Sequence, residues 1–78
     1  MPVIDVYSRP GCHLCEVLID ELIPLVRDRA SVAVHDVDAD PRWRARYGGD
    51  VPVVVLGGRE LCRHRLDADA VTGALAAG

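Results

Sequence analysis

The sequence predicts an α/β domain in which helices flank a four-stranded mixed sheet, in the order β-α-β-α-β-β-α. Two observations carry this prediction. Short valine-rich runs of strand length alternate with longer segments whose apolar residues recur at helical spacing. Later in the chain, two strand-like runs meet at Gly57 and Gly58, a pair typical of a hairpin turn. A chain of 78 residues has the size of one domain, so residues 1–78 are expected to fold as a single unit.

The first half of the chain predicts a right-handed βαβ unit. Residues 3–7 form a short, largely apolar strand that a Pro-Gly pair ends. From Cys12 onward the apolar residues fall on one stripe of a helix, although Pro24 is expected to kink this helix or to end it early. Residues 32–37 supply a second strand, and the long helix between the two strands favours their parallel pairing. The stripe consists of Leu14, Cys15, Leu18, Ile19, Leu22, Leu25 and Val26.

A short second helix follows. Asp40 and Pro41 are typical of a helix start, because aspartate caps the first backbone N–H groups and proline tolerates the first helical position. The Gly-Gly pair at residues 48–49 ends the helix. Trp43 and Tyr47 lie four residues apart, so we expect them to pack as a pair on its inner face.

The last third of the chain predicts a hairpin and a final helix. Residues 53–56 form a third strand and residues 59–64 a fourth, paired antiparallel, and the polar character of the fourth suits the edge of a sheet. Asp67 is expected to cap the last helix, which Gly73 weakens and whose alanine-rich end should fray. The inward-facing residues of that helix are expected to be Val71, Ala74 and Leu75.

The charge pattern and the lengths of the apolar runs exclude nucleic acid and membranes as partners. Nine arginines are outnumbered by twelve acidic residues, the net charge is -3, and no basic stripe suited to nucleic acid is present. Even the densest basic cluster, Arg42, Arg44 and Arg46, splays around a helix and is expected to be a solvated surface. No apolar run approaches the roughly 18 residues of a membrane span, and residues 1–6 resemble a strand, not a signal peptide. We therefore expect a cytoplasmic protein that binds neither nucleic acid nor membranes.

Cys12 and Cys15 form a Cys-x-x-Cys pair where the first strand meets the first helix. Three cysteines in a short chain without a signal peptide argue against a structural disulfide framework. At the expected N-cap, the sulfur of Cys12 would face unpaired backbone N–H groups and the positive end of the helix dipole, which favour the thiolate. Cys15 falls on the apolar stripe and should be shielded. This arrangement predicts Cys12 as a nucleophile and Cys15 as the thiol that resolves its mixed disulfide.

A metal site is the rival interpretation. On the predicted fourth strand, Cys62 and His64 alternate and should share a face. Together with Cys12 and Cys15 they would give a Cys₃His zinc site, and an iron-sulfur cluster shared between subunits is a further alternative. The spacing of one residue on a strand is unlike the usual zinc-binding turn. Taken alone, Cys62 is either a half-buried strand cysteine or an auxiliary redox thiol.

The element order, the Cys-x-x-Cys position and the Val51-Pro52 dipeptide before the third strand together resemble the thioredoxin fold in its smallest, glutaredoxin-like form. Within that fold, the run Arg-Pro-x-Cys-x-Leu-Cys ending at Cys15 is similar to a group of small bacterial glutaredoxin-like proteins. The resemblance spans the whole chain and implies a three-layer fold. It also implies that the peptide bond before Pro52 is cis and that Val51 and Pro52 face the dithiol, where they would bind the backbone of a substrate.

Two neighbours of the dithiol are candidates for a role in its chemistry. Arg9 lies where glutaredoxins commonly carry a basic residue, so it is either a residue that steers an anionic thiol and favours the Cys12 thiolate, or a plain surface arginine. His13 would favour that thiolate when protonated, unless its ring points into solvent. Cys62 is, with His13, a possible modulator.

The chain also departs from the glutaredoxin pattern. His13 and Leu14 replace the usual Pro and Tyr between the cysteines, and Cys62 and Arg63 fall where glutaredoxins carry a glycine pair of the glutathione site. The segment at residues 65–67, Arg-Leu-Asp, is similar to the Arg-Pro-Asp of redoxins that thioredoxin reductase reduces. The electron donor is therefore open between glutathione, another small thiol and thioredoxin reductase.

From these residues we predict a thiol-disulfide oxidoreductase. Cys12 and Cys15 carry the reaction, Arg9, Val51 and Pro52 contact the substrate, and no cofactor is needed. The expected partners are a disulfide-containing protein or a low-molecular-weight thiol, together with an unidentified reductase or thiol as electron donor, and the chain is expected to act as a monomer. The alternative is a metal-binding module.

Overall fold

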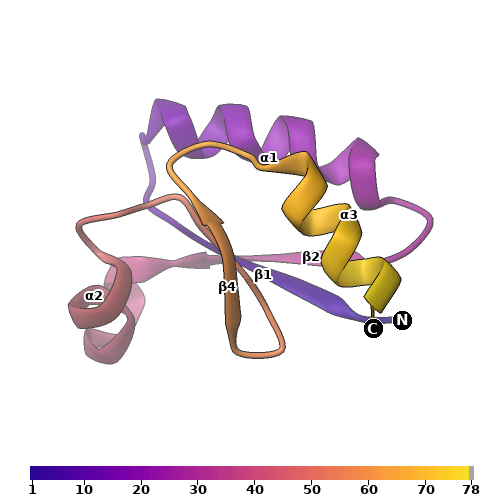
Figure 1. Ribbon diagram of the computed structural model, residues 1–78. Coiled ribbons are helices and arrows are strands. Elements are labelled where there is room, and N and C mark those ends of the chain that lie inside the picture. The colour runs from indigo at the N-terminus through magenta and orange to yellow at the C-terminus, as the bar shows by residue number, and fades with distance from the viewer. Residues whose placement is uncertain (78) are drawn as a thin grey trace.

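The computed structural model describes residues 1–77 and has the predicted order of elements, with one extra 3-10 turn (Figure 1). The strands are β1 (Val3–Ser8), β2 (Ser31–Asp36), β3 (Val53–Leu56) and β4 (Arg59–Arg63). The helices are α1 (His13–Val26), α2 (Pro41–Tyr47) and α3 (Ala68–Ala77), and η1 (Val37–Ala39) is the 3-10 turn. Within the described part of the chain, no helix combines the length and the apolar character that a membrane crossing requires.

The sheet has the order β2-β1-β3-β4. Strand β1 pairs in parallel with β2 and antiparallel with β3, and β4 pairs antiparallel with β3. The parallel βαβ unit, the antiparallel hairpin and the edge position of the fourth strand are therefore confirmed. Since β1 and β3 run in opposite directions, the end of β1 lies beside the start of β3.

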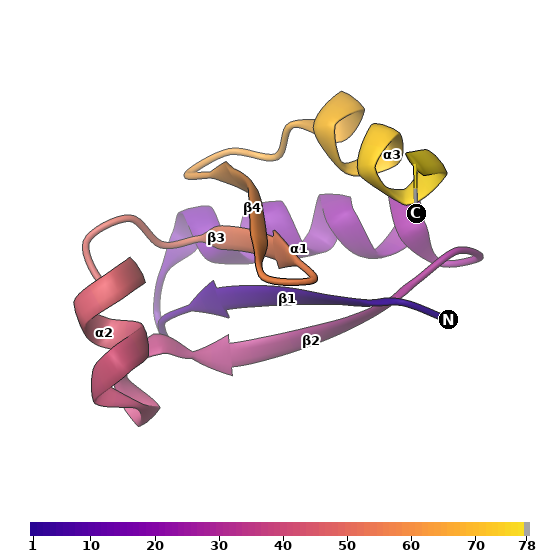
Figure 2. The same cartoon turned by 60° about the horizontal axis from the view of Figure 1, so that its bottom comes forward.

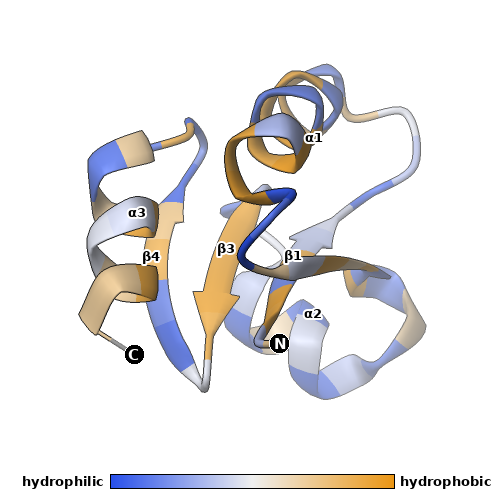
Figure 3. Ribbon diagram, turned by 90° about the vertical axis from the view of Figure 1, so that its right-hand side faces the viewer, coloured by the Kyte–Doolittle hydropathy of each residue, from blue (hydrophilic) through white to orange (hydrophobic). Residues whose placement is uncertain are grey.

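The helices form layers on both sides of the sheet (Figures 1 and 2). Helices α1 and α3 cover one face, and α2 lies on the other side of the sheet, near the end of β1. The hydrophobic side of α1 faces the sheet, and β3 is hydrophobic along its length (Figure 3). Alternate residues of the strands point to opposite faces. The larger core contains Ile4, Val6, Leu18, Leu22, Val26, Ala30, Val54 and Val71, and the smaller core contains Val37, Tyr47, Val53 and Val55.

Helix α1 differs from its prediction in two respects. It continues through Pro24 to Val26, so an early end is wrong. Pro24 removes one hydrogen bond in the last turn, where both Pro24 and Asp20 are exposed, and the unpaired carbonyl of Asp20 can be solvated. In addition, Leu14 was expected on the buried stripe, but it is 51% exposed in the first turn, before the helix reaches the core.

Two strand boundaries also differ. Val37 begins the turn η1 after β2, and its side chain is fully buried. Strand β4 ends at Arg63, so His64 lies outside it with a left-handed φ of 69°. An irregularity in the pairing places Cys62 opposite Val54 but Glu60 opposite Val55, which makes Leu61 an extra residue.

Helix α2 is held by its caps and by aromatic packing. The Asp40 side chain accepts a hydrogen bond from the Arg42 N–H at 2.8 Å, as its N-cap position predicts. Trp43 and Tyr47 both pack toward the sheet, where each contacts Tyr7 of β1. The ring centroid of Tyr7 lies 5.5 Å from that of Trp43 and 4.4 Å from that of Tyr47. Tyr7 therefore anchors the aromatic cluster that joins α2 to the sheet.

Candidate active site

Cys12 and Cys15 lie at the start of α1, directly after the loop that follows β1. They form a disulfide with their Cα atoms 5.2 Å apart. Cys12 is the N-cap residue, as predicted, and its sulfur accepts a hydrogen bond from the Cys15 N–H at 3.2 Å. The loop is closed by the Cys12 N–H, which donates to the carbonyl of Arg9 at 3.1 Å, and Gly11 has the positive φ of 79° that this turn requires.

The two cysteines differ in exposure. Cys12 is half-buried, whereas Cys15 is only 2% exposed and lies behind it, on the side of α1 that faces the core. A thiolate at the position of Cys12 would accept the N–H groups of the first helical turn. The geometry therefore gives one cysteine access to solvent and keeps the other within reach of the first.

Val51 and Pro52 lie at the same end of the sheet. The peptide bond between them is cis, as the resemblance implied. Tyr7 pairs with Val53 in the β1–β3 ladder, so Pro52 comes next to the end of β1, where the loop to Cys12 begins. Pro52 is buried and Val51 is half-buried, and the carbonyl of Pro52 accepts a hydrogen bond from His64 N–H at 2.8 Å.

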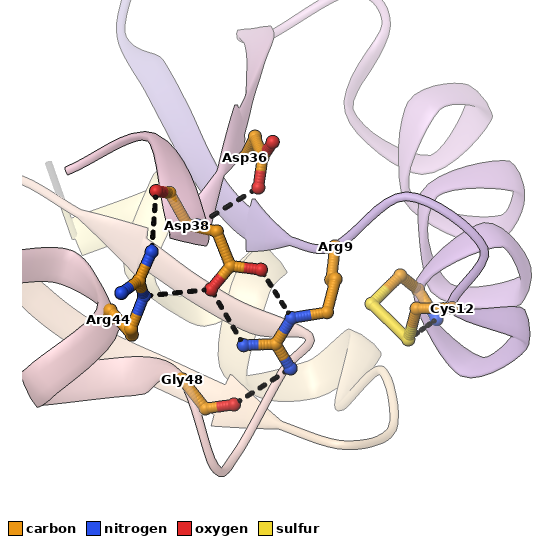
Figure 4. A network of polar contacts seen from close by, with 7 residues as sticks. Arg9, Cys12, Asp36, Asp38, Arg44 and Gly48 are labelled. Carbon is orange, nitrogen blue, oxygen red and sulfur yellow. Dashed lines mark hydrogen bonds and ion pairs between the residues drawn. A yellow bond between two sulfur atoms is a disulfide. The ribbon is translucent and has the colours of Figure 1, made fainter. Parts of the chain in front are cut away.

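Arg9 binds Asp38 of η1 and not the dithiol. Its Nε and Nη2 atoms donate to the two carboxylate oxygens of Asp38 at 2.8 Å and 3.1 Å, and its Nη1 donates to the carbonyl of Gly48 at 3.1 Å. The guanidinium thus points away from Cys12 (Figure 4). Asp38 also accepts a hydrogen bond from Arg44 at 3.1 Å. The hydrogen bond from Arg9 is the largest cause that lowers the pKa of Asp38, and it raises the pKa of Arg9 in turn.

Sequence reasoning missed Asp38 as a partner of the active-site loop. One signal was available: β1 and β2 are parallel neighbours, so the segments that follow their ends must lie side by side. Arg9 follows β1, and the acidic run at residues 36–40 follows β2. An arginine beside such a run is well placed for a bidentate ion pair.

The remaining candidates do not gather around the dithiol. His13 is exposed on the first turn of α1. Cys62 is half-buried and packs against the larger core, and burial raises the pKa of its thiol. The Nε2 atom of His64 lies 3.5 Å from a carboxylate oxygen of Asp50. The shared strand face expected for Cys62 and His64 is wrong, because His64 follows the end of β4.

The zinc interpretation depended on that shared face. Across residues 1–77, no group of three or more histidine, cysteine or acidic side chains is placed to hold a metal ion. The Cys12, Cys15, Cys62 and His64 set therefore does not assemble as a tetrahedral site would require.

A helix-flanked mixed sheet with a Cys-x-x-Cys pair at the start of its first helix defines the thioredoxin-like class of proteins. Comparison with known proteins narrows this class. Residues 3–76 match the family described as Glutaredoxin-like domain (DUF836), and the chain belongs to this family.

Individual relatives agree with the family and the fold. An uncharacterized protein of Mycobacterium tuberculosis is 33% identical over an alignment of 79 positions, which covers 87% of this chain and 81% of the relative. An X-ray structure of a structural genomics target protein from X. campestris has a TM-score of 0.71 and 30% identity, with 96% of this chain and 97% of that chain covered. The germline-specific thioredoxin Deadhead of Drosophila melanogaster has a TM-score of 0.55 at 22% identity, covering 97% and 79% of the two chains, and supports the fold alone.

Proposed function

We propose that this protein is a thiol-disulfide oxidoreductase in which Cys12 is the nucleophile and Cys15 the resolving thiol. The observation that carries the proposal is the unequal placement of the two sulfurs. Cys12 is accessible and accepts an N–H of the first helical turn, whereas Cys15 is buried directly behind it. The thiolate is the reactive form, and a helix N-terminus favours it.

The reaction follows from this placement. In the reduced protein, the Cys12 thiolate attacks one sulfur of a substrate disulfide, which forms a mixed disulfide and releases the other sulfur as a thiolate that takes up a proton. The Cys15 thiol then loses its proton and attacks the Cys12 sulfur, which releases the second substrate thiol. Two electrons pass from the protein to the substrate, and the Cys12–Cys15 disulfide remains. The protein contributes only its own two thiols to this reaction.

The neighbouring residues suggest how a substrate is held. We propose that Val51, which precedes β3 at the end of the sheet where β1 leads into the dithiol loop, pairs with the backbone of a bound polypeptide. Arg9 would act by fixing the loop before Cys12, because Asp38 and Gly48 already occupy its donors. The proposed partners are a disulfide-containing protein or a small disulfide, with a reductase or thiol as electron donor. A monomer in the cytoplasm is the setting that we propose.

The test is to identify the covalent intermediate. Reduced protein is treated with bis(2-hydroxyethyl) disulfide, quenched with acid and analysed by mass spectrometry. We expect the unsubstituted protein to end as the Cys12–Cys15 disulfide, Cys15→Ser to retain one mercaptoethanol adduct on Cys12, and Cys12→Ser to react far more slowly. Cys62→Ser is the matched control and should behave like the unsubstituted protein. If Cys12→Ser kept its reactivity while Cys15→Ser lost it, the roles of the two thiols would be reversed.

A further inference from the structure

A hollow beside the dithiol has a chemistry that the sequence did not suggest. It is lined by both cysteines, by the first turns of α1 and by the end of β2, and it lies on the β2 side of Cys12. Ser8, Glu16 and Asp36 are polar side chains of its lining, and Pro10, Ile19 and Val34 are apolar ones. A substrate group that extends from Cys12 toward β2 would lie against this surface.

The charges of the hollow are negative in balance. Arg9 borders it, but its guanidinium is held by Asp38 and points away (Figure 4). Glu16 and Asp36 form no ion pair within residues 1–77. Asp36 accepts one hydrogen bond, from the Asp38 N–H at 2.9 Å, which leaves carboxylate lone pairs available. Glu16 and Asp36 therefore line the hollow without an ion pair among the described residues, although the charge of Asp36 is one of the causes that raise the pKa of Arg9.

Two of the uncharged side chains in the lining bear on what could bind there. Ser8 is 8% exposed, and its hydroxyl has no hydrogen-bond partner in the described part of the chain, although it lines the hollow. Val34 is 51% exposed and offers an apolar surface beside it. A hydroxyl acceptor, two carboxylates and an apolar side chain together suit an ammonium or guanidinium group on a short apolar stem.

We propose that this hollow selects disulfides that carry a cationic group within one side-chain length of the reacting sulfur. The source of that cation is either a small aminothiol or a lysine or arginine next to the cysteine of a protein substrate. The inference rests on the proposed function and specifies its substrate class. It reverses the role expected for Arg9, because disulfides of anionic thiols would meet Glu16 and Asp36 and not a positive charge.

The selection acts on the first step of the exchange. With cystamine as the substrate, the Cys12 thiolate forms a mixed disulfide with one cysteamine and releases the other, which takes up a proton. Cys15 then displaces the bound cysteamine, so the protein is oxidised by two electrons and one cystamine yields two cysteamines. The ammonium group of the mixed disulfide would lie among Ser8, Glu16 and Asp36.

The experiment compares three disulfides of different charge. Reduced protein is mixed with cationic cystamine, neutral bis(2-hydroxyethyl) disulfide or anionic dithiodiglycolate, and each rate is divided by the rate of the same disulfide with free dithiothreitol. We expect the normalised rate for cystamine to exceed that for dithiodiglycolate about fivefold, since each exposed charge contact contributes a factor of about 1.5 to 5. The preference should shrink in high salt.

Substitutions identify the source of the preference. In Glu16→Gln/Asp36→Asn, the ratio of the normalised rates for cystamine and dithiodiglycolate should fall to within about twofold. Asp28→Asn/Asp69→Asn removes the same charge from the turn after α1 and from the first turn of α3, and should keep the preference. Ser8→Ala changes no charge and should lower the cystamine rate about twofold. An unchanged cystamine rate in Ser8→Ala would contradict its part in the site.

The outcomes separate the two proposals. If reduced protein reacts with none of the three disulfides, the oxidoreductase proposal fails, and this inference fails with it. Reaction without a preference for cystamine, or a preference that survives Glu16→Gln/Asp36→Asn, overturns this inference alone. Mixed disulfides of peptides with lysine or glutamate beside the cysteine then distinguish the sources. A lysine peptide that outpaces both cystamine and the glutamate peptide indicates a protein substrate, whereas faster reaction of cystamine indicates a small aminothiol.

Discussion

Truncation of Leu18 tests how firmly the helix that carries the dithiol is held on the sheet. Leu18 lies three residues after Cys15, is 1% exposed and belongs to the larger core with Ile4 and Val54. Leu18→Ala is therefore expected to leave a cavity between α1 and the sheet. Such a truncation costs about 2–5 kcal/mol of unfolding free energy, and a middle value is about 3 kcal/mol.

That loss is large for a chain of this size. A domain of 78 residues is expected to have an unfolding free energy of about 4–12 kcal/mol. At about 4–8 °C per kcal/mol, a loss of about 3 kcal/mol lowers the melting temperature by about 12–24 °C. We expect Leu18→Ala to fold, with a marginal stability that urea or thermal denaturation can measure.

Leu14→Ala is the matched control, because it is the same truncation one helical turn earlier, where the side chain is 51% exposed. It is expected to cost less than about 1 kcal/mol. Both variants are measured in the reduced state by urea denaturation with far-ultraviolet circular dichroism. A difference of less than about 1 kcal/mol between the two would refute the reasoning, since it would mean that the buried face of α1 contributes no more than its exposed face.

Three further predictions concern side chains around the site. Arg9 holds the pKa of Asp38 below its usual range, so the stability from this pair should be present above the ordinary carboxyl pKa and be lost as the pH falls through the lowered value. In urea denaturation at a series of acidic pH values, Asp38→Asn should therefore lose less stability than the unsubstituted protein as the pH falls. An equal loss in the two proteins would argue against the pair. Burial raises the pKa of the Cys62 thiol. In Cys12→Ser/Cys15→Ser, where Cys62 is the remaining thiol, the rate of its alkylation by iodoacetamide should therefore have a pH midpoint above that of an exposed thiol. A midpoint equal to that of free cysteine would contradict the burial. The Asp67 side chain caps α3 and accepts a hydrogen bond from the Ala70 N–H at 3.0 Å. Asp67→Ala should therefore lower the unfolding free energy measured by urea denaturation by about 1 kcal/mol, whereas Asp69→Ala, which removes no cap, should lower it clearly less. Equal losses would count against the cap.

The architecture was predictable because its signals are local. Strand runs, the helical stripe, the capping residues Asp40 and Asp67 and the glycine pair at residues 57–58 each act within a few residues of sequence. The direction of pairing then follows from the length of each connection. The dithiol was predictable for the same reason, since its spacing and its place at a helix start lie in one short segment.

The errors arose where distant residues decide the structure. Strand β4 ends at Arg63 and His64 adopts a left-handed conformation, which no local pattern announced, so the expected shared face of Cys62 and His64 was wrong. The environment of Arg9 depends on Asp38, which is 29 positions away along the chain. Likewise, Ser8, Glu16 and Asp36 meet at one hollow only because β2 lies beside β1.

The contacts of Arg9 also determine what would have to accompany the dithiol in an engineered protein. Arg9 precedes Cys12 by one turn of loop, but its donors end on Asp38 and on the carbonyl of Gly48. A segment from Ser8 to Cys15 grafted onto another sheet would carry both thiols and leave a guanidinium without acceptors. The smallest portable unit of this site therefore includes the turn after β2 and the end of α2, together with the Cys-x-x-Cys loop.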